Sequence, residues 1–339
     1  MALNFTFLTE DQIWSDDAPD VMKRYGTKVA PTDLTVILGS WMTGEDDRTS
    51  EDDLTCLSWS ASFSGSEDVS CVYYNGDMRG SSAKARDISA RPALPPSEAS
   101  KISPSEARAI AGIRVVEYGE YPQTVADDVT SEKLERLHKS KSLRPTGKSF
   151  TFDSADDDYK TSFEATSYQE YEMDGKRYIR VPGRPADKNS KLSTGKQVES
   201  GKPYWVEVQP IEWLLDGSGW MVAKKCLFAG IQFDTKDSLF NCDFSKTSIK
   251  HYLDTYFAKE IEPSQTIERT KRKEIANSVS KGGLKDFLAS KAKRLDEVSK
   301  SVRKSLKEKG LTGKALHDTE QKERLKVSKA ILKKRQGTK

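Results

Sequence analysis

Histidine is scarce in this chain, and none of its three histidines sits in a catalytic pattern. His138 and His251 lie on expected helices and His317 lies near the end of the chain, and none neighbours a cysteine or serine in a nucleophile arrangement. The motifs G-x-S-x-G, G-x-G-x-x-G, H-E-x-x-H and the phosphate-binding P-loop are missing as well. We therefore expect no catalytic residue and a protein that is not an enzyme.

Cysteine is almost as sparse, and its spacing excludes the common metal sites. Cys56, Cys71, Cys226 and Cys242 are scattered, with no C-x-x-C pair and no histidine at ligand spacing. We expect free, partly buried thiols, and a Cys56–Cys71 disulfide stays open if the protein is exported. The acidic run Asp156–Asp158 lacks the spacing of a calcium loop and is interpreted as a solvated loop. The sequence thus predicts no metal site and no cofactor.

Long apolar runs are also missing. No stretch approaches the roughly 18 apolar residues that a membrane-spanning helix needs. The opening MALNFTFLTEDQIW lacks the basic start and the apolar run of a secretory signal. We expect no membrane span and, by default, a cytoplasmic location.

Charge is abundant but unevenly distributed. Residues 263–339 carry 23 Lys or Arg against 9 Asp or Glu, a net charge of +14, whereas the whole chain carries only +3, which leaves −11 for residues 1–262. Leucine and valine form a narrow stripe between Leu284 and Leu306, which predicts helices. We expect a basic helical tail that binds nucleic acid or an acidic protein. Base stacking is not expected there, because Phe287 is the one aromatic residue after Phe257.

Local signals in the first 96 residues predict helices followed by a hairpin. Thr9 with Gln12 three residues later forms a capping-box pattern, and Pro19 predicts a break in the helical region that follows. Asn75-Gly76 is a strong hairpin-turn dipeptide. The expected elements are a helical region over 9–25, a helix over 32–40, a loop over 43–53, and strand-like segments over 57–62, 69–74 and 88–94.

The next 166 residues predict a linker, a meander and a last helix. Residues 97–112 are rich in serine and alanine and are interpreted as a helical linker. The stretch Tyr204–Phe233 is the most apolar of the chain, and a turn is expected at Asp216–Gly219. The other expected elements are a strand from 113 into a turn at Pro122, a helix over 130–139, strands over 168–173 and 176–181, and an amphipathic helix over 248–261. This mixture predicts an α+β domain.

Two sets of motifs resemble the two halves of one known bacterial family of unknown function. One half reads G-x-Y-P-Q, then P-I-x-W, then S-x-[IL]-[KR]-x-[WYF]-L, and it matches residues 116–124, 205–223 and 244–257. The other half reads as a helix after FL[LT], then W-x-[RAS]-S, a glycine-containing hairpin and V-R-P-A-L. It matches residues 7–11, 59–62, 75–76 and 90–94.

The order of the two halves is reversed in this chain, so the resemblance implies a circular permutation. The family resembles the C-type lectin-like fold, the group of the formylglycine-generating sulfatase modifiers and of the variable proteins of diversity-generating retroelements. Permutation is physically reasonable because domain termini often lie close together. The implied organisation is a second half over 1–96, a linker over 97–112, a first half over 113–262 and the basic tail over 263–339.

Two departures limit what the resemblance implies. Cys226 and Cys242 do not sit in the cysteine motif of the formylglycine-generating enzymes, which argues against that oxidase activity. The E-P-N and W-N-D signatures of calcium-dependent lectins are missing too. The resemblance is closest to gut-bacterial variable proteins, which implies ligand binding with exchangeable residues on a fixed scaffold.

The segment from Trp59 to Arg91 is the expected binding surface for a protein or small-molecule ligand. It is rich in Tyr, Ser, Gly, Asp and Arg, which antibody-like surfaces use because they give contact area and adaptable hydrogen bonds at low entropy cost. The alternative is an ordinary polar loop of a structural domain. The candidate ligand-binding residues are Ser60, Phe63, Ser64, Ser66, Asp68, Ser70, Tyr73, Tyr74, Asn75, Asp77, Arg79, Lys84 and Arg86.

Two other residue types in the domain are interpreted as structural. Arg91 is better explained as a partly buried side chain that pins the end of the hairpin than as an anion-binding arginine. The tryptophans expected in the core, rather than as stacking platforms, are Trp59, Trp205, Trp213 and Trp220.

Overall fold

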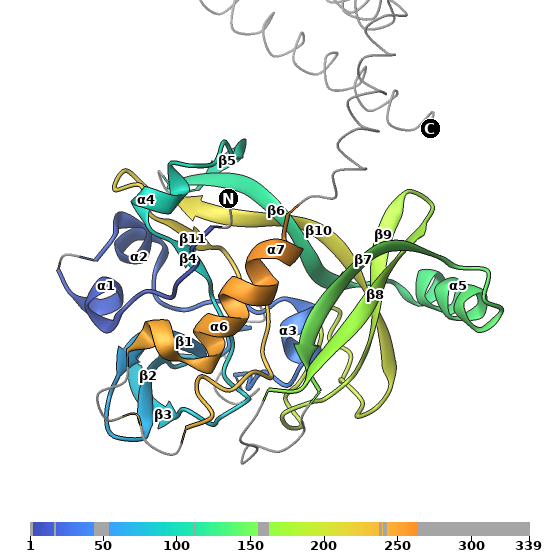
Figure 1. Cartoon of the computed structure of the whole chain (residues 1–339), viewed down its shortest axis with the longest axis horizontal. Helices are drawn as coiled ribbons and strands as arrows, with labels where there is room; N and C mark the ends of the chain where they lie inside the picture. Colours follow the sequence, from blue (N-terminus) through green and yellow to red (C-terminus); the bar gives the residue numbers. More distant parts are fainter. Residues whose placement is uncertain are drawn as a thin grey trace, which may run out of the picture. The chain divides into compact units, whose positions relative to one another are not determined.

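The computed structural model of the chain describes residues 3–16, 18–43, 54–110, 113–154, 163–236, 239 and 243–262 (Figure 1). These residues combine helices with two antiparallel sheets, which confirms the α+β class. The chain divides into two compact units, Met1–Pro263 and Ser264–Lys339. The second unit lies outside the described residues, so the basic helical tail stays a prediction.

The larger sheet is built around one long strand, β10 (Pro203–Leu215). Residues 203–207 of β10 pair with β9 on one edge and residues 213–215 pair with β11, while β6 runs along the other edge. The strand is long because its run of apolar and β-branched residues is buried over most of its length. The other strands of this sheet are β4 (Ala93–Leu94), β5 (Ser105–Ile110), β6 (Ile113–Val125), β7 (Arg144–Asp153), β8 (Ala165–Met173), β9 (Lys176–Pro182) and β11 (Met221–Ala223).

The smaller sheet contains the segment expected to bind ligand. Its strands are β1 (Ser58–Phe63), β2 (Asp68–Val72) and β3 (Met78–Ser82), in that spatial order. The expected hairpin at Asn75-Gly76 is confirmed, because Val72 pairs with Met78 across the turn. β1 and β2 carry the buried side chains of this sheet, whereas β3 is mostly exposed.

Short helices flank the sheets, and several begin at the predicted residues, whereas the helix expected from residue 130 begins at Asp128. The capping box of Thr9 and Gln12 begins the first helix, and Pro19 precedes the second. The last helical segment contains a π-helical turn, so it consists of three consecutive pieces. The helices are α1 (Glu10–Trp14), α2 (Asp20–Tyr25), α3 (Asp33–Ile37), α4 (Pro96–Ala99), α5 (Asp128–Lys139), the 3-10 turn η2 (Phe244–Lys246), α6 (Ser248–Tyr252), the π-helix η3 (Leu253–Phe257) and α7 (Ala258–Glu260).

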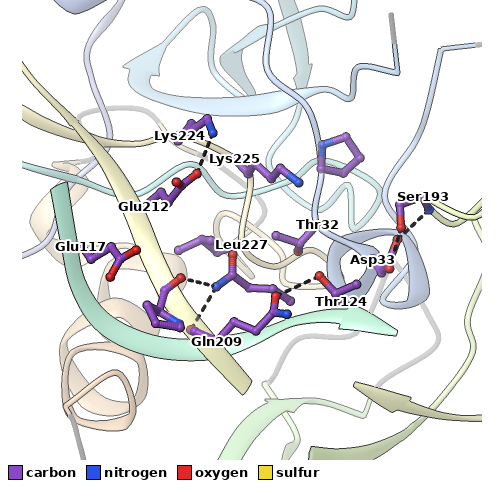
Figure 2. Close-up of a pocket in the computed structure, with 13 residues that line it drawn as sticks. Thr32, Asp33, Glu117, Thr124, Ser193, Gln209, Glu212, Lys224, Lys225 and Leu227 are labelled. Carbon is purple, nitrogen blue, oxygen red and sulfur yellow. Dashed lines mark hydrogen bonds and ion pairs between the residues drawn. The ribbon is translucent and has the colours of Figure 1, made fainter. Parts of the chain in front are cut away.

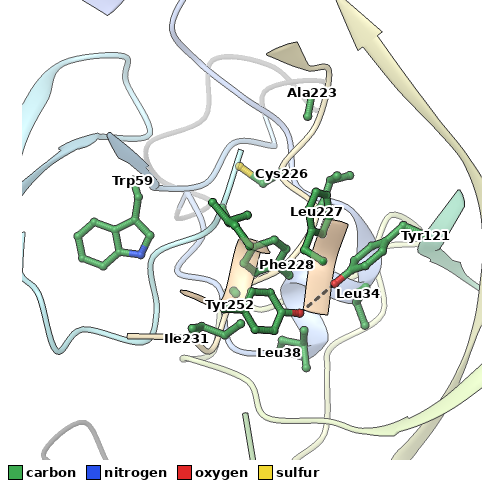
Figure 3. Close-up of a cluster of buried hydrophobic side chains, with 14 of the residues drawn as sticks. Leu34, Leu38, Trp59, Tyr121, Ala223, Cys226, Leu227, Phe228, Ile231 and Tyr252 are labelled. Atoms are coloured by element: carbon green, nitrogen blue, oxygen red, sulfur yellow. Dashed lines mark hydrogen bonds between the residues drawn. The ribbon is translucent and has the colours of Figure 1, made fainter. Parts of the chain in front are cut away.

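Aromatic side chains from distant parts of the sequence form the centre of the core. Tyr121 and Tyr252 lie with their hydroxyls 3.3 Å apart, and the Phe228 ring packs beside both (Figure 3). Phe5, near the start of the chain, packs edge-on against Phe257 of the last helical segment. Since β4 also pairs with β11, residues before 95 and after 113 share one sheet and one core.

Several elements differ from the sequence predictions, among them the segment over 88–94, which forms a strand only at Ala93–Leu94, and the helix expected over 32–40, which ends at Ile37. The helical linker expected over 97–112 is wrong beyond Ala99, because Ser105–Ile110 forms β5 and pairs with β6. The turn expected at Pro122 is absent, since β6 continues through this residue beside a β-bulge. β7 was not expected from the sequence at all. The loop predicted over 43–53 lies, apart from Thr43, outside the described residues.

Within the described ranges, no helix is both long enough and apolar enough to cross a membrane.

Candidate functional site

Three of the thirteen candidate binding residues are buried and are used inside the domain. The hydroxyl of Ser60 donates to the Ser70 carbonyl at 2.9 Å, and the hydroxyl of Ser70 lies 3.1 Å from a Glu10 carboxylate oxygen. Arg86 forms a 2.9 Å ion pair with Asp153 and is 9% exposed. The expectation that Ser60, Ser70 and Arg86 contact a ligand is therefore corrected, because these side chains join β1 to β2, β2 to α1, and the segment after β3 to β7.

Two further candidates are only partly accessible. Phe63 packs edge-on against Phe233 at a ring-centroid distance of 5.8 Å. Lys84 is half-buried, and its carbonyl accepts a hydrogen bond from the Gln232 side chain. Both residues therefore lie at the boundary between the small sheet and the segment that follows β11.

The exposed candidates fall into two groups at opposite ends of the small sheet. Ser64, Ser66 and Asp68 lie at or beside the β1–β2 turn, whereas Asn75, Asp77 and Arg79 lie at or beside the β2–β3 turn. The five residues of β2 separate the groups by roughly 16 Å, at about 3.3 Å per residue. One small ligand cannot contact both ends, so the structure divides the predicted surface.

The β2–β3 end carries a cluster of aromatic rings that we call the aromatic patch, formed by Trp41, Tyr73, Tyr74 and Arg79. Tyr73 and Tyr74 have ring centroids 4.4 Å apart, and Trp41 lies 5.7 Å and 5.4 Å from them. The guanidinium carbon of Arg79 lies 4.8 Å from the Tyr73 centroid, which is a cation–π contact. Sequence reasoning missed Trp41, because it lies 32 residues before Tyr73 and only the fold brings the rings together.

The turn that carries the aromatic patch is held rigidly. Both Trp14 Nε1 and the Thr27 hydroxyl donate to the Gly76 carbonyl at 3.0 Å. Gly76 has a φ of 92°, and a Cβ there would lie 2.5 Å from the Thr27 hydroxyl oxygen, so glycine is required. Asn75 and Asp77 brace the same turn by a 2.6 Å side-chain hydrogen bond. The geometry of the patch is therefore set before any ligand arrives.

Arg91 and the core tryptophans take the structural roles that the sequence predicts. Arg91 is 7% exposed, and its Nε donates to the Ala223 carbonyl at 2.9 Å. Trp59, Trp205 and Trp213 are at most 2% exposed. Trp220 is half-buried against a second core cluster.

The described cysteines are free thiols, and no disulfide joins Cys56 to Cys71. Cys56, Cys71 and Cys226 are all buried, while Cys242 lies outside the described residues. Burial raises the pKa of Cys71 to about 12. Burial, together with the neighbouring Cys56, also raises the pKa of Cys226 well above its ordinary value. Thiolate chemistry is therefore suppressed at both sites.

Two of the three histidines lie among the described residues. His138 lies on α5 with its ring between Tyr171 and Trp205, and His251 lies exposed on α6. Across the residues that the structure describes, no group of three or more His, Cys, Asp or Glu side chains could hold a metal ion. His317 and the acidic run Asp156–Asp158 lie outside those residues.

A pocket of about 260 Å³ lies away from the predicted surface, between the β6–β10 ladder and the start of α3 (Figure 2). Its lining includes Glu117 and Gln123 of the VEYGEYPQT motif and Glu212 of the PIEW motif. The side-chain amide of Gln123 donates to the carbonyls of Gln209 and Pro210 at 3.0 and 2.9 Å. The motifs that carry the family resemblance thus form one wall of this pocket.

The opposite wall of the pocket depends on the buried carboxylate of Asp33. This carboxylate accepts hydrogen bonds from the Val125 amide and from both the amide and the hydroxyl of Ser193. It therefore ties α3 to β6 and to the loop that contains Ser193. Sequence reasoning did not identify this pocket, although the two glutamates of neighbouring strand motifs were a usable signal.

A scan against protein-family models finds no match to this chain, and searches of curated proteins and of solved structures find none either.

Proposed function

We propose that the protein is a non-enzymatic ligand-binding protein whose recognition surface lies around residues 58–91 and is centred on the aromatic patch. The observation that carries this proposal is the cluster of the Trp41, Tyr73 and Tyr74 rings, with Arg79 over Tyr73. Tyr, Trp and Arg are enriched among the residues that supply most binding energy in protein interfaces. A protein ligand therefore suits the patch best.

The rigidity of the turn supports the same function. A loop that is already ordered loses little conformational entropy when it binds, so more of the contact energy appears as affinity. Here the hydrogen bonds of Trp14 and Thr27 to Gly76 supply that order. The exposed side chains of Asn75 and Asp77 add polar groups at the edge of the patch.

We further propose that the domain is a circularly permuted C-type lectin-like fold. A permuted chain needs its new ends close together, and Lys250 Nζ donates to the Asn4 side chain at 2.7 Å. It also needs a connection between the old ends, and residues 95–112 connect β4 to β6 within one sheet. These two observations support a permutation, whereas the assignment to the C-type lectin-like fold depends on the sequence motifs.

The proposal includes diversification of the surface by a retroelement. If it is correct, the gene lies near a reverse transcriptase gene and a near-repeat of the codons for residues 58–94, and closely related copies differ mainly between Ser58 and Ser89. Sequencing the locus and several copies tests this. A locus with neither feature would remove diversification and leave ligand binding in place.

Ligand binding is tested by quantitative affinity capture from cells that produce the protein. The full chain and a Tyr73→Ser/Arg79→Ser variant serve as baits, and an Arg144→Ser/Glu172→Ser variant, altered at an exposed cross-strand pair of β7 and β8, serves as the control. We expect the full chain and the control to enrich the same partner and the patch variant to lose it about tenfold or more. Equal enrichment by the patch variant, or no enriched partner at all, contradicts the proposal.

A second candidate function is favoured by the charge of residues 263–339, which is +14. A tail of this charge attracts nucleic acid or an acidic protein by releasing counterions, so its affinity falls steeply with salt. Filter binding of the full chain and of a chain ending at Pro263, to DNA and to RNA across salt concentrations, tests the nucleic-acid form of this function. No binding by the full chain at low salt removes it.

A further inference from the structure

Two carboxylates face each other across the β6–β10 ladder at the pocket between this ladder and α3. Glu117 and Glu212 are direct cross-strand partners, and both line the pocket. Like charges at directly opposite positions destabilise a sheet. Such a pair is therefore unfavourable unless a cation compensates it.

Within the described part of the chain, only one of the two carboxylates, that of Glu212, has a cation as its partner. Lys224 Nζ lies 2.6 Å from a Glu212 carboxylate oxygen. Among the described residues, by contrast, no hydrogen bond or ion pair reaches the half-buried Glu117 carboxylate. Glu117 therefore brings to the pocket a negative charge that no described side chain neutralises.

The backbone is shaped so that Glu117 faces the pocket. The register between β6 and β10 shifts at Tyr118-Gly119 and again at Gln123, which are two β-bulges within seven residues. Gly119 has a φ of 72°, and a Cβ there would lie 3.0 Å from the Ile261 carbonyl oxygen, so the first bulge requires glycine. Bulges re-aim neighbouring side chains, and here they border both Glu117 and the amide of Gln123.

Lys225 also lines the pocket and brings a positive charge to it, whereas the Asp33 carboxylate on the far wall is occupied by hydrogen bonds from Val125 and Ser193. Figure 2 shows the exposed Lys225 side chain extending away from Glu117 toward Thr32. Within the described part of the chain, Lys225 has no ion-pair partner. One unpaired carboxylate and one unpaired ammonium therefore lie on different sides of one pocket.

The size of the pocket limits its occupant to a small molecule. Its volume of about 260 Å³ is below the roughly 300–1,000 Å³ typical of pockets that enclose drug-sized ligands. The rest of the lining includes the Gln209 amide and the hydroxyls of Thr32 and Thr124, together with apolar Leu227. This lining suits a small polar molecule that has a charge at each end.

We propose that this pocket binds a small zwitterion of amino-acid size, with its ammonium group at Glu117 and Glu212 and its carboxylate at Lys225. The two charges of the ligand would complete the two charges that the protein leaves unpaired. This site is separate from the aromatic patch, so it goes beyond the proposed function and does not depend on it.

Isothermal titration of the full chain with each of the free proteinogenic amino acids tests the proposal. For every amino acid that binds, the N-acetyl and the carboxamide derivatives are titrated as well, because each removes one of the two charges. We expect at least one amino acid to bind and each derivative to bind about 10- to 100-fold more weakly, as is usual when a charged hydrogen bond is lost. The absence of any binding amino acid, or a derivative that binds as well as its parent, overturns the proposal.

Variants of the two unpaired residues give an independent readout. Glu117→Gln and Lys225→Gln should each weaken binding by about 10-fold or more, while Glu172→Gln and Lys188→Gln, at exposed positions elsewhere, should leave it unchanged. Without ligand, Glu117→Gln should also raise the melting temperature, because it removes the cross-strand repulsion. Unchanged affinity in Glu117→Gln overturns the proposal even if that variant is more stable.

Discussion

At the scale of single residues, burial keeps the three described thiols from solvent and raises the pKa of Cys71 and Cys226. At Cys56 burial is outweighed by the side-chain hydrogen bonds, first of all with Cys226, which lower the pKa. A pKa of about 12 at Cys71 leaves roughly one thiol in ten thousand ionised near pH 8. We therefore expect a Cys242→Ser variant, which keeps only Cys56, Cys71 and Cys226, to react with a thiol reagent only as fast as the protein opens. The measurement is the labelling rate in native buffer against that in urea, where all three thiols should react at once. Rapid labelling of the native variant would contradict this.

Arg177 forms ion pairs with two buried carboxylates. Its guanidinium lies 2.8 Å from Glu120 and 3.4 Å from Glu170, whose side chain is 0% exposed. Removing one partner of a buried ion pair typically costs about 3–5 kcal/mol, because the remaining charges lose their compensation without regaining water. We expect Arg177→Met to lower the free energy of unfolding by about this amount in urea titration.

The neighbouring Lys176 provides the matched control for Arg177. It pairs with Glu207 at 2.9 Å, but its side chain is 59% exposed, so solvent screens the interaction. Lys176→Met should therefore change the free energy of unfolding by no more than about 1 kcal/mol. Equal losses in the two variants would show that the Arg177 cluster is not more strongly coupled than a surface pair.

At the scale of elements, α7 carries a carboxyl group that should make stability pH-dependent. The Glu260 carboxylate accepts the Thr151 amide hydrogen at 3.0 Å, and burial raises its pKa from 4.5 to about 7. The folded protein therefore holds this proton more tightly than the unfolded chain does. The stability that it contributes is fully present below about pH 4.5 and is lost as the pH rises through about 7.

The pKa shift of Glu260 sets the size of this pH effect on stability. This pKa shift corresponds to at most about 3 kcal/mol in the free energy of unfolding. Glu260→Gln should abolish the loss of stability at higher pH, because its amide has no proton to release but still offers an oxygen acceptor to the Thr151 amide. Glu135 acts in a separate window, because its hydrogen bonds with Arg180 lower its pKa to about 2, so its contribution disappears only as the pH falls below about 4.5. Between pH 5 and pH 8 the pH dependence of the unfolding free energy in urea titrations should therefore differ between the wild type and Glu260→Gln, whereas Glu135→Gln should be less stable by a constant amount and run parallel to the wild type. Parallel curves for the wild type and Glu260→Gln would contradict the assignment.

Elements whose signals are local could be predicted from the sequence. The capping box at Thr9 and Gln12 and the Asn75-Gly76 turn each involve residues that are close in the chain, and both are present. β5 was interpreted as helical because its serine and alanine content says nothing of its partner, and it exists because β6 pairs with it. Strand formation here depends on tertiary pairing, which composition does not encode.

The candidate site shows the same division between local and long-range information. The residue types around the β2–β3 turn indicated a surface, and six of the thirteen candidates are exposed there or at the β1–β2 end. Burial of Ser60, Ser70 and Arg86 could not be foreseen, because alternation along a strand does not tell which face a second layer covers. The approach of Trp41 and the Glu117–Glu212 pairing both require the register and topology of the fold.

At the scale of the whole molecule, the core of the first unit is closed by its own last helical segment. Phe257 and Ile261 are 0% exposed, and the Phe257 ring packs on Phe5, so the sequence between these residues completes one core. Residues 264–339 form the other compact unit. A chain that ends at Pro263 therefore keeps every described side chain of this core.

We expect this truncated chain to unfold in urea at the same midpoint as the corresponding transition of the full chain, within about 0.5 kcal/mol in free energy. A chain that ends at Thr247 is the matched control, because it removes the buried side chains of Tyr252, Leu253 and Phe257 and exposes the aromatic core around Tyr121. Each large apolar side chain taken from a core costs about 2–5 kcal/mol, so the loss of three is about as large as the whole stability of an ordinary domain. The shorter chain should thus show no cooperative transition. A shifted midpoint in the chain ending at Pro263 would instead mean that the basic tail contributes to the stability of the acidic unit.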